Sequence, residues 1–122
     1  MNHLKVKKIV INVFKNFKLK EAHARISAGY LIKAELLGAP SHGLARLKMY
    51  CERLNRKIIN PNPKIKIKKI SQSISHIDAN NGIGFVAADL GIKIAIKNAK
   101  KTGIGLVAIK NIGHYGLSGF YA

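Results

Sequence analysis

The 122-residue sequence is poor in several residue types, and each shortage excludes a class of protein. Cys51 is the single cysteine, so no disulfide can form within the chain, which fits a reducing compartment. The chain has only five acidic residues, so we do not expect a catalytic mechanism that needs two carboxylates. No apolar run approaches the roughly 18 residues of a membrane span. We therefore expect a cytoplasmic protein with no membrane partner, in which Cys51 is a small buried apolar residue.

Two families of binding motif are also missing. The dinucleotide fingerprint G-x-G-x-x-G does not occur, and there is no P-loop. His3, His23 and His76 have no metal-ligand spacing to one another, and no pair of cysteines accompanies them. We therefore predict no metal site.

The charge is strongly one-sided, with a formal net charge of +17. A charge of this size usually indicates a polyanionic partner such as nucleic acid. Lysines occur in every segment, however, together with many isoleucines, and nucleotide bias in a genome produces that combination. A nucleic-acid footprint should instead cluster on one face. We favour the compositional explanation and do not expect nucleic acid as a partner; a basic nucleic-acid-binding module is the alternative interpretation.

The first half of the sequence predicts helices. Apolar residues at spacings of three and four indicate helices over residues 4–17 and 18–37. Gly38 stands where a helix end favours a positive φ. Ser41 is a candidate N-cap of a third helix that runs to about Lys57.

The segment Asn60-Pro61-Asn62-Pro63 cannot lie inside a helix, so we place a helical N-terminal segment at residues 1–59 and an α/β domain at residues 60–122. That domain predicts strands at 64–70 and 74–78, a helix at 85–101, a buried strand at 104–109 and the start of a further helix near Leu117. Alternating lysine and isoleucine should bury one face of the first strand. So few strands leave exposed edges, so we expect an incomplete, partial mixed sheet with helices.

The segment Ser41-His42-Gly43 is the first candidate site. A histidine beside a hydroxyl can exchange a proton near neutral pH. On a continuous helix, spacings of four put His42, Arg46 and Tyr50 in line along one face. Such a row would hold a small carboxylate, which arginine binds through two hydrogen bonds. The alternative interpretation is that His42 decorates a helix end, with Arg46 on the surface and Tyr50 in the core.

The second candidate site is Gly113-His114-Tyr115-Gly116, which follows the last predicted strand. Open α/β sheets bind ligands outside the carboxyl ends of their strands, where this histidine would lie. The alternative interpretation is a loop histidine between turn glycines.

Four segments, in order, resemble the malate/L-lactate dehydrogenase type 2 family. The first segment, Gly38 to Gly43 with Ala45-Arg46-Leu47 and Tyr50, is similar to the family's S-H-G-x-x-R motif, and the second, Ile59 to Pro63, resembles the segment that follows it. The third, Asp78 to Gly84, is similar to the family's D-x-x-x-G-x-G turn. The fourth, Gly103 to Asn111 with Gly113 to Gly116, is similar to its strand and histidine loop. The agreement in order and spacing extends over essentially the whole chain.

The resemblance implies an oxidoreductase that moves a hydride between NAD or NADP and a small 2-hydroxy or 2-oxo acid. Family members include malate, L-lactate, sulfolactate and ureidoglycolate dehydrogenases; they are usually homodimers, and their nucleotide-binding domain is not of the Rossmann type. We expect this chain to be a truncated, N-terminal portion of such an enzyme, and an inactive remnant is the alternative.

The resemblance also implies roles for individual residues. His114 and His42 would be the active-site histidines, with His114 exchanging the proton of the substrate hydroxyl and Ser41 orienting His42. Arg46, with Tyr50, would hold the substrate carboxylate. Gly113 and Gly116 would lie near the nicotinamide.

Overall fold

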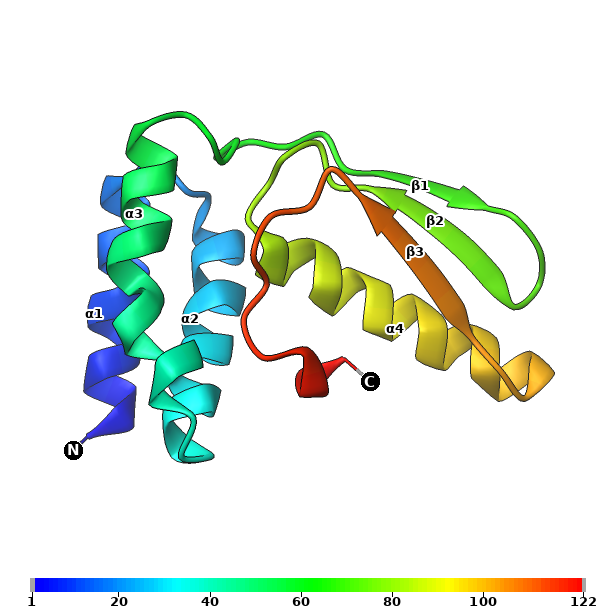
Figure 1. The fold of residues 1–122 in the computed structure, drawn as a ribbon, viewed down its shortest axis with the longest axis horizontal. Helices are drawn as coiled ribbons and strands as arrows, with labels where there is room; N and C mark the ends of the chain where they lie inside the picture. The colour runs from blue at the N-terminus through cyan, green and yellow to red at the C-terminus, as the bar shows by residue number, and fades with distance from the viewer. Residues whose placement is uncertain (1, 122) are drawn as a thin grey trace. The chain divides into compact units, whose positions relative to one another are not determined.

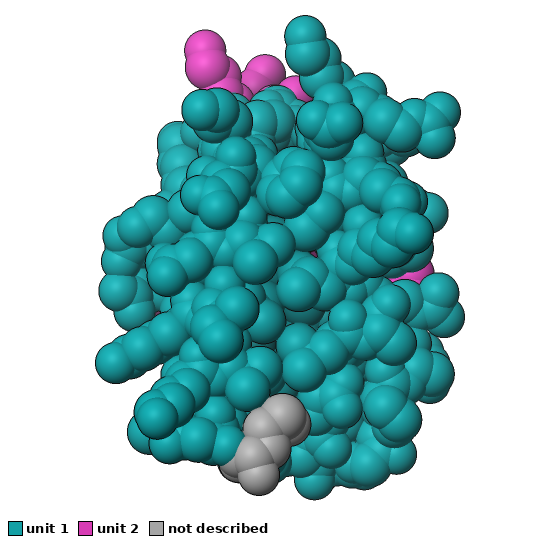
Figure 2. All heavy atoms as spheres, turned by 90° about the vertical axis from the view of Figure 1, so that its left-hand side faces the viewer, with its two compact units in different colours: residues 1–62 teal, residues 63–122 magenta. Residues whose placement is uncertain are grey.

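The computed structural model describes residues 2–121 of the chain (Figure 1). The chain divides into two compact units, Met1–Asn62 and Pro63–Ala122, which are coloured separately in Figure 2. The first unit is helical, and the second combines a sheet with a helix. The predicted α/β class, with a helical N-terminal segment and a partial mixed sheet, is confirmed. The domain boundary after residue 59 stays a prediction.

The first unit consists of the helices α1 (His3–Asn16), α2 (Glu21–Leu36) and α3 (Leu47–Asn55). Asn2 caps α1, because its side-chain oxygen accepts hydrogen bonds from the backbone N–H groups of Leu4 and Lys5, each at 3.1 Å. The helices share an apolar core. Cys51 lies in it and is 8% exposed, as predicted. Burial raises the pKa of the Cys51 thiol.

The third helix starts later than predicted. Two short 3₁₀ turns, Pro40–His42 and Leu44–Arg46, precede α3, which begins at Leu47. Gly43 separates these turns with φ −98° and ψ −134°, a backbone that is neither helical nor extended. The prediction that Ser41 caps a continuous helix is therefore wrong, and so is the expected row of side chains along one face of that helix.

The second unit contains the strands β1 (Lys66–Lys69), β2 (Ile74–Asp78) and β3 (Leu106–Lys110), with the helix α4 (Gly84–Thr102) between β2 and β3. The strand order is β1-β2-β3; β1 pairs with β2 in antiparallel fashion, and β2 pairs with β3 in parallel fashion. The sheet is therefore mixed. Helix α4 ends at Thr102 and is followed by its C-cap Gly103, whose φ of +83° is the left-handed conformation that glycine favours.

Helix α4 covers one face of β2 and β3. A Cβ atom added to Gly91 would lie 3.0 Å from Cδ1 of Ile109, so the helix approaches the sheet closely at this glycine. On β2, Ile77 is fully buried on this side. Figure 1 shows α4 running along the sheet.

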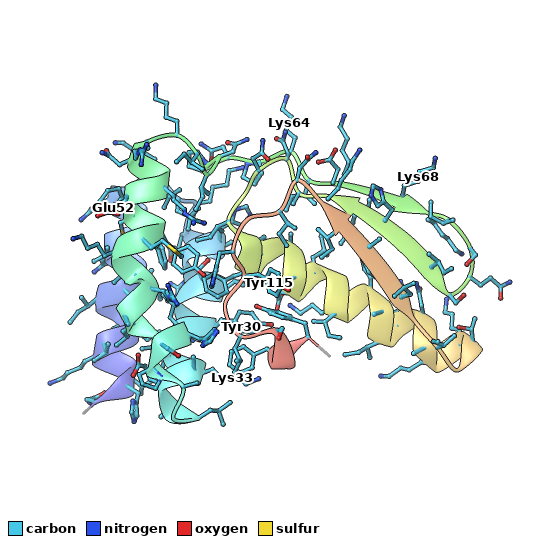
Figure 3. All side chains as sticks on the ribbon, in the orientation of Figure 1. Tyr30, Lys33, Glu52, Lys64, Lys68 and Tyr115 are labelled. Atoms are coloured by element: carbon cyan, nitrogen blue, oxygen red, sulfur yellow. The ribbon has the colours of Figure 1, made fainter. Side chains whose placement is uncertain are left out.

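Burial in the strands differs from the prediction. All four residues of β1 are exposed, and Ile67 is 54% exposed, so the expected buried face is wrong. Strand β3 has no buried residue either, and Leu106 is 58% exposed. The reason is that α4 packs mainly on one face of β2 and β3, while β1 lies at the far edge of the sheet. Lys68 projects from β1 away from α4 (Figure 3).

Each helix within residues 2–121 is too short or too polar to cross a lipid bilayer.

Candidate functional site

The end of α2 places the Ser41-His42-Gly43 segment. Gly38 has a φ of +72°, as predicted, and the backbone N–H of Ala39 donates to the carbonyl of Ala34 at 2.9 Å. This closing pattern stops the helix and reverses the chain. Pro40 then fixes the first residue of the following 3₁₀ turn. The reversal returns the chain to the last turn of α2.

Ser41 and His42 form a hydrogen-bonded pair. The Ser41 Oγ lies 3.1 Å from Nδ1 of His42, which is half-buried. A hydroxyl can either donate or accept, so this contact is compatible with both neutral tautomers of the ring. The Nε2 atom of His42 can therefore either offer or accept a proton.

Arg46 is tied to the same segment. Its Nε–H donates to the backbone carbonyl of Ser41 at 2.7 Å. The backbone N–H of Arg46 donates to the carbonyl of Gly43 at 3.0 Å. A guanidinium carries further N–H donors, which suit a carboxylate. The structure therefore brings Ser41, His42 and Arg46 together, through 3₁₀ turns rather than through a helix face.

Tyr50 lies in a different environment from these three residues. It is completely buried, and its ring packs edge-on against Phe14, with 6.4 Å between ring centroids and 67° between ring planes. This position corresponds to the alternative interpretation of Tyr50 as a core residue. Its part in substrate binding stays a prediction.

Glu35 also contacts the Ser41-His42-Gly43 segment and was not predicted from the sequence as a site residue. Its Oε1 accepts a hydrogen bond from the backbone N–H of Leu44 at 2.6 Å. A Cβ atom added to Gly43 would lie within van der Waals overlap of the same carboxylate, 2.8 Å from its carbon Cδ. Its scarcity was an available signal: Glu35 is one of five acidic residues in a lysine-rich chain and precedes the motif closely.

The loop that carries His114 begins after β3 and packs against the start of α4. A Cβ atom added to Gly84 would overlap the carbonyl oxygen of His114. A Cβ atom added to Gly116, which has a φ of +81°, would lie 2.6 Å from Cε1 of the buried Phe85. Both glycines are thus required by contacts within this unit.

The ring of His114 is oriented by its own loop. The backbone N–H of Gly116 donates to Nδ1 of His114 at 3.2 Å. A neutral ring that accepts at Nδ1 carries its proton on Nε2. Gly113 is exposed, and a Cβ atom added to it would meet nothing within 4 Å. No contact within the unit therefore requires a glycine at position 113, whereas the glycine at 116 is explained by Phe85.

Asp78 fixes the base of this loop. Its Oδ1 accepts from the backbone N–H of Asn80 at 3.0 Å and from the side-chain amide of Asn111 at 2.9 Å, and the Lys110 ammonium lies 3.5 Å from its Oδ2. The Asn111 amide, the Asn80 N–H and Lys110 together hold the pKa of the Asp78 carboxyl below its ordinary value. Asp78 therefore ties the carboxyl ends of β2 and β3 together.

The second unit also contains a cavity of about 480 Å³ between α4, β3 and the C-terminal segment. Its lining is mainly apolar and includes Gly91, Val107, Ile109, Tyr115 and Tyr121. None of the predicted site residues lines it. Within residues 2–121, no group of three histidine, cysteine or acidic side chains is arranged as metal ligands.

The predicted site residues are divided between the units. Ser41, His42, Arg46 and Tyr50 belong to residues 1–62, and the loop of His114 belongs to residues 63–122. Each group is built by contacts within its own unit.

Comparison with known proteins relates both groups to one family. A model of the malate/L-lactate dehydrogenase family matches residues 1–122. The L-sulfolactate dehydrogenase of Methanocaldococcus jannaschii is 40% identical over 95% of this chain and 34% of its own length. The malate dehydrogenase of Pyrococcus abyssi is 42% identical over 93% of this chain and 31% of its own length.

A solved structure agrees with these relatives. The malate dehydrogenase of Pyrococcus horikoshii OT3 superimposes with a TM-score of 0.93 at 37% identity, covering 98% of this chain and 34% of the other. The chain thus spans about a third of the length of the proteins it matches.

Proposed function

Because this chain belongs to the malate/L-lactate dehydrogenase family, we propose that it supplies carboxylate-binding and proton-transfer residues for a dehydrogenase of small 2-hydroxy or 2-oxo acids. The observation that carries this proposal is the cluster of Ser41, His42 and Arg46, with a hydroxyl–imidazole contact of 3.1 Å and an arginine held at 2.7 Å. It combines a proton-exchanging ring with a guanidinium, the two groups that a hydroxy acid requires.

Arg46 binds the carboxylate of the substrate in this proposal. Its Nε is committed to the Ser41 carbonyl, which fixes the plane of the guanidinium before the substrate arrives. A fixed plane lowers the entropy lost on binding. Tyr50, being buried, would support the helix below Arg46 and hold the carboxylate only indirectly.

His42 and His114 exchange protons with the substrate oxygen in this proposal, and we assign the hydroxyl proton to His114. In reduction of a 2-oxo acid, a His114 imidazolium would give its Nε2 proton to the oxo oxygen while the hydride adds to the carbon. In oxidation, the neutral ring would take the hydroxyl proton at Nε2, so its own proton would lie on Nδ1. The hydrogen bond from the Gly116 N–H to Nδ1 must therefore break for the reaction in either direction. Ser41 orients His42 through Nδ1.

Oxidation of a hydroxy acid releases a hydride from carbon besides the hydroxyl proton, and NAD or NADP is the proposed acceptor of that hydride. The open backbone at Gly113 fits the approach of a flat ring. Gly116 would contribute by holding the loop against Phe85. We also propose a homodimer and a cytoplasmic location.

The test is the binding of L-malate to the 122-residue chain, monitored by NMR. The signals observed are the side-chain resonances of Arg46 and the ring resonances of His42 and His114. We expect L-malate to shift them and Arg46→Gln to weaken binding about tenfold to a hundredfold, the strength of a charged hydrogen bond. Lys48→Gln, on an exposed side chain nearby in sequence, is the charge-matched control.

Turnover is measured separately, as oxidation of NADH or NADPH by oxaloacetate or pyruvate. If saturating L-malate leaves all these resonances unchanged, the proposed function is refuted and the inactive remnant is supported. Binding of DNA with a steep salt dependence, unaffected by replacing His42 and His114, would favour the nucleic-acid-binding alternative.

A further inference from the structure

Glu35 lies outside every motif that the sequence analysis identified, yet it contacts the Ser41-His42-Gly43 segment directly. Its carboxylate is partly buried and accepts from the backbone N–H of Leu44 at 2.6 Å. We infer that Glu35 is a positioning residue, whose carboxylate holds the loop so that His42 and Arg46 face the substrate. This inference rests on the proposed function.

The hydrogen bond from Leu44 to Glu35 satisfies a free donor at the start of a 3₁₀ turn. Leu44 begins the second 3₁₀ turn, Leu44–Arg46, so its N–H has no partner within that turn. A short bond to an ionised acceptor is among the stronger hydrogen bonds in proteins. Glu35 thereby caps the turn that carries Arg46, from a helix that ends before the loop begins.

The backbone of Gly43 is neither helical nor extended, with φ −98° and ψ −134°. The Glu35 carboxylate occupies the space where any other residue would place a Cβ atom. The 3₁₀ turn Pro40–His42 therefore ends at this point and cannot continue into α3. His42 is thus directed by a pair of residues: a glycine that leaves room and a carboxylate that fills it.

The reach of the Glu35 side chain can be distinguished from its charge by substitution. The function assigned to Glu35 needs an oxygen at the end of a three-carbon side chain. Gln keeps that oxygen in place, whereas Asp draws it back by about 1.5 Å, one carbon–carbon bond. From 2.6 Å, that retreat takes the oxygen beyond hydrogen-bond reach of the Leu44 N–H.

The experiment compares Glu35→Asp, Glu35→Gln and Gly43→Ala in the 122-residue chain by NMR. The readouts are hydrogen exchange of the Leu44 amide and the ring ¹⁵N resonances of His42. We expect Glu35→Asp to accelerate exchange at least about tenfold, in line with loss of a hydrogen bond to a charged acceptor. Glu35→Gln should stay within about threefold of the native chain, because it restores the acceptor.

Gly43→Ala displaces the carboxylate without altering it, so it should shift the His42 ring resonances in the same direction as Glu35→Asp. Glu52→Asp is the matched control, because Glu52 projects outward from α3 (Figure 3) and its partner, Lys48, lies at 3.7 Å on the same helix. If Glu35→Asp fails to fold, the comparison of Gly43→Ala with Glu35→Gln still decides.

The inference is overturned if Gly43→Ala leaves the His42 ring resonances unchanged, if Glu35→Gln departs from the native chain as far as Glu35→Asp, or if Glu52→Asp has the same effect. Titration with L-malate separates this outcome from failure of the proposed function. If the native chain does not bind L-malate, the proposed function is refuted. The hydrogen exchange of the Leu44 amide and the ring resonances of His42 still test the role of Glu35. Where L-malate binds, Glu35→Asp should weaken the binding of L-malate about tenfold, and Glu35→Gln should not.

Discussion

Replacing Gly116 with alanine tests how the loop of His114 is held. The residue has a φ of +81°, and an added Cβ would lie 2.6 Å from Cε1 of Phe85, a fully buried ring. The left-handed backbone costs a non-glycine residue about 1–2 kcal/mol, and overpacking a buried site costs about 1–3 kcal/mol more. We therefore expect Gly116→Ala to lower the free energy of unfolding of the second unit by about 2–5 kcal/mol.

Gly113→Ala is the matched control in the same loop. An added Cβ there meets nothing within 4 Å, and Gly113 has no positive φ. Alanine at this position should leave the free energy of unfolding unchanged or raise it by up to about 1 kcal/mol, because it restricts the unfolded chain. The two substitutions add the same methyl group on either side of His114, so composition cannot explain a difference.

The assay is urea denaturation followed through amide resonances of β2 and β3, since the two units need not unfold together. For a unit of this size, a free energy of unfolding of roughly 3–9 kcal/mol is typical, so the loss of stability caused by Gly116→Ala should be large enough to measure. Phe85→Leu should partly relieve Gly116→Ala, because the two sites are in contact. Equal effects of Gly113→Ala and Gly116→Ala, or strict additivity with Phe85→Leu, would refute the reasoning.

Three further substitutions or titrations follow from single contacts. Asn2→Ala removes the cap of α1 and should cost about 1 kcal/mol, seen as a lower thermal midpoint with reduced helicity. Burial raises the pKa of Cys51, so its thiol should react slowly with a disulfide reagent; the associated stability is present below the unfolded pKa and falls as pH rises above it. The pKa of Asp78 is lowered chiefly by its hydrogen bond from Asn111. The stability that ionised Asp78 contributes is therefore present above the ordinary carboxyl pKa and is lost as the pH falls through the lowered pKa. Asn111→Ala should make this loss complete at a higher pH, which denaturation measured between acidic and neutral pH would show.

Elements that depend on short-range pattern could be predicted from the sequence. Helix α4 was expected at residues 85–101 and lies at Gly84–Thr102, and β2 was expected and found at residues 74–78. The positive φ at Gly38 followed from its place after a periodic helix. In each case, the signal and the structure it specifies lie within a few residues of each other.

Features that depend on distant residues could not be predicted in this way. The start of α3 is delayed by a carboxylate on α2, and no local pattern around Ser41 indicates it. The exposure of β1 depends on how many elements pack on the sheet, which an alternation of lysine and isoleucine does not report. Ser41, His42 and Arg46 nevertheless come together, because hydrogen bonds replace the expected helix face.

The glycines beside the two histidines show why a motif can identify a site and still mislead about its parts. The family resemblance implies that two of them, Gly113 and Gly116, lie near the nicotinamide. In the structure, Gly43 makes room for Glu35, Gly84 for the carbonyl of His114, and Gly116 for Phe85. Their substitution should therefore alter ligand binding only by moving a histidine loop, with a matching change in stability. Gly113, unlike these three glycines, leaves space for an added Cβ. A substitution at Gly113 that weakens cofactor binding without lowering stability would therefore indicate direct contact between the cofactor and this residue.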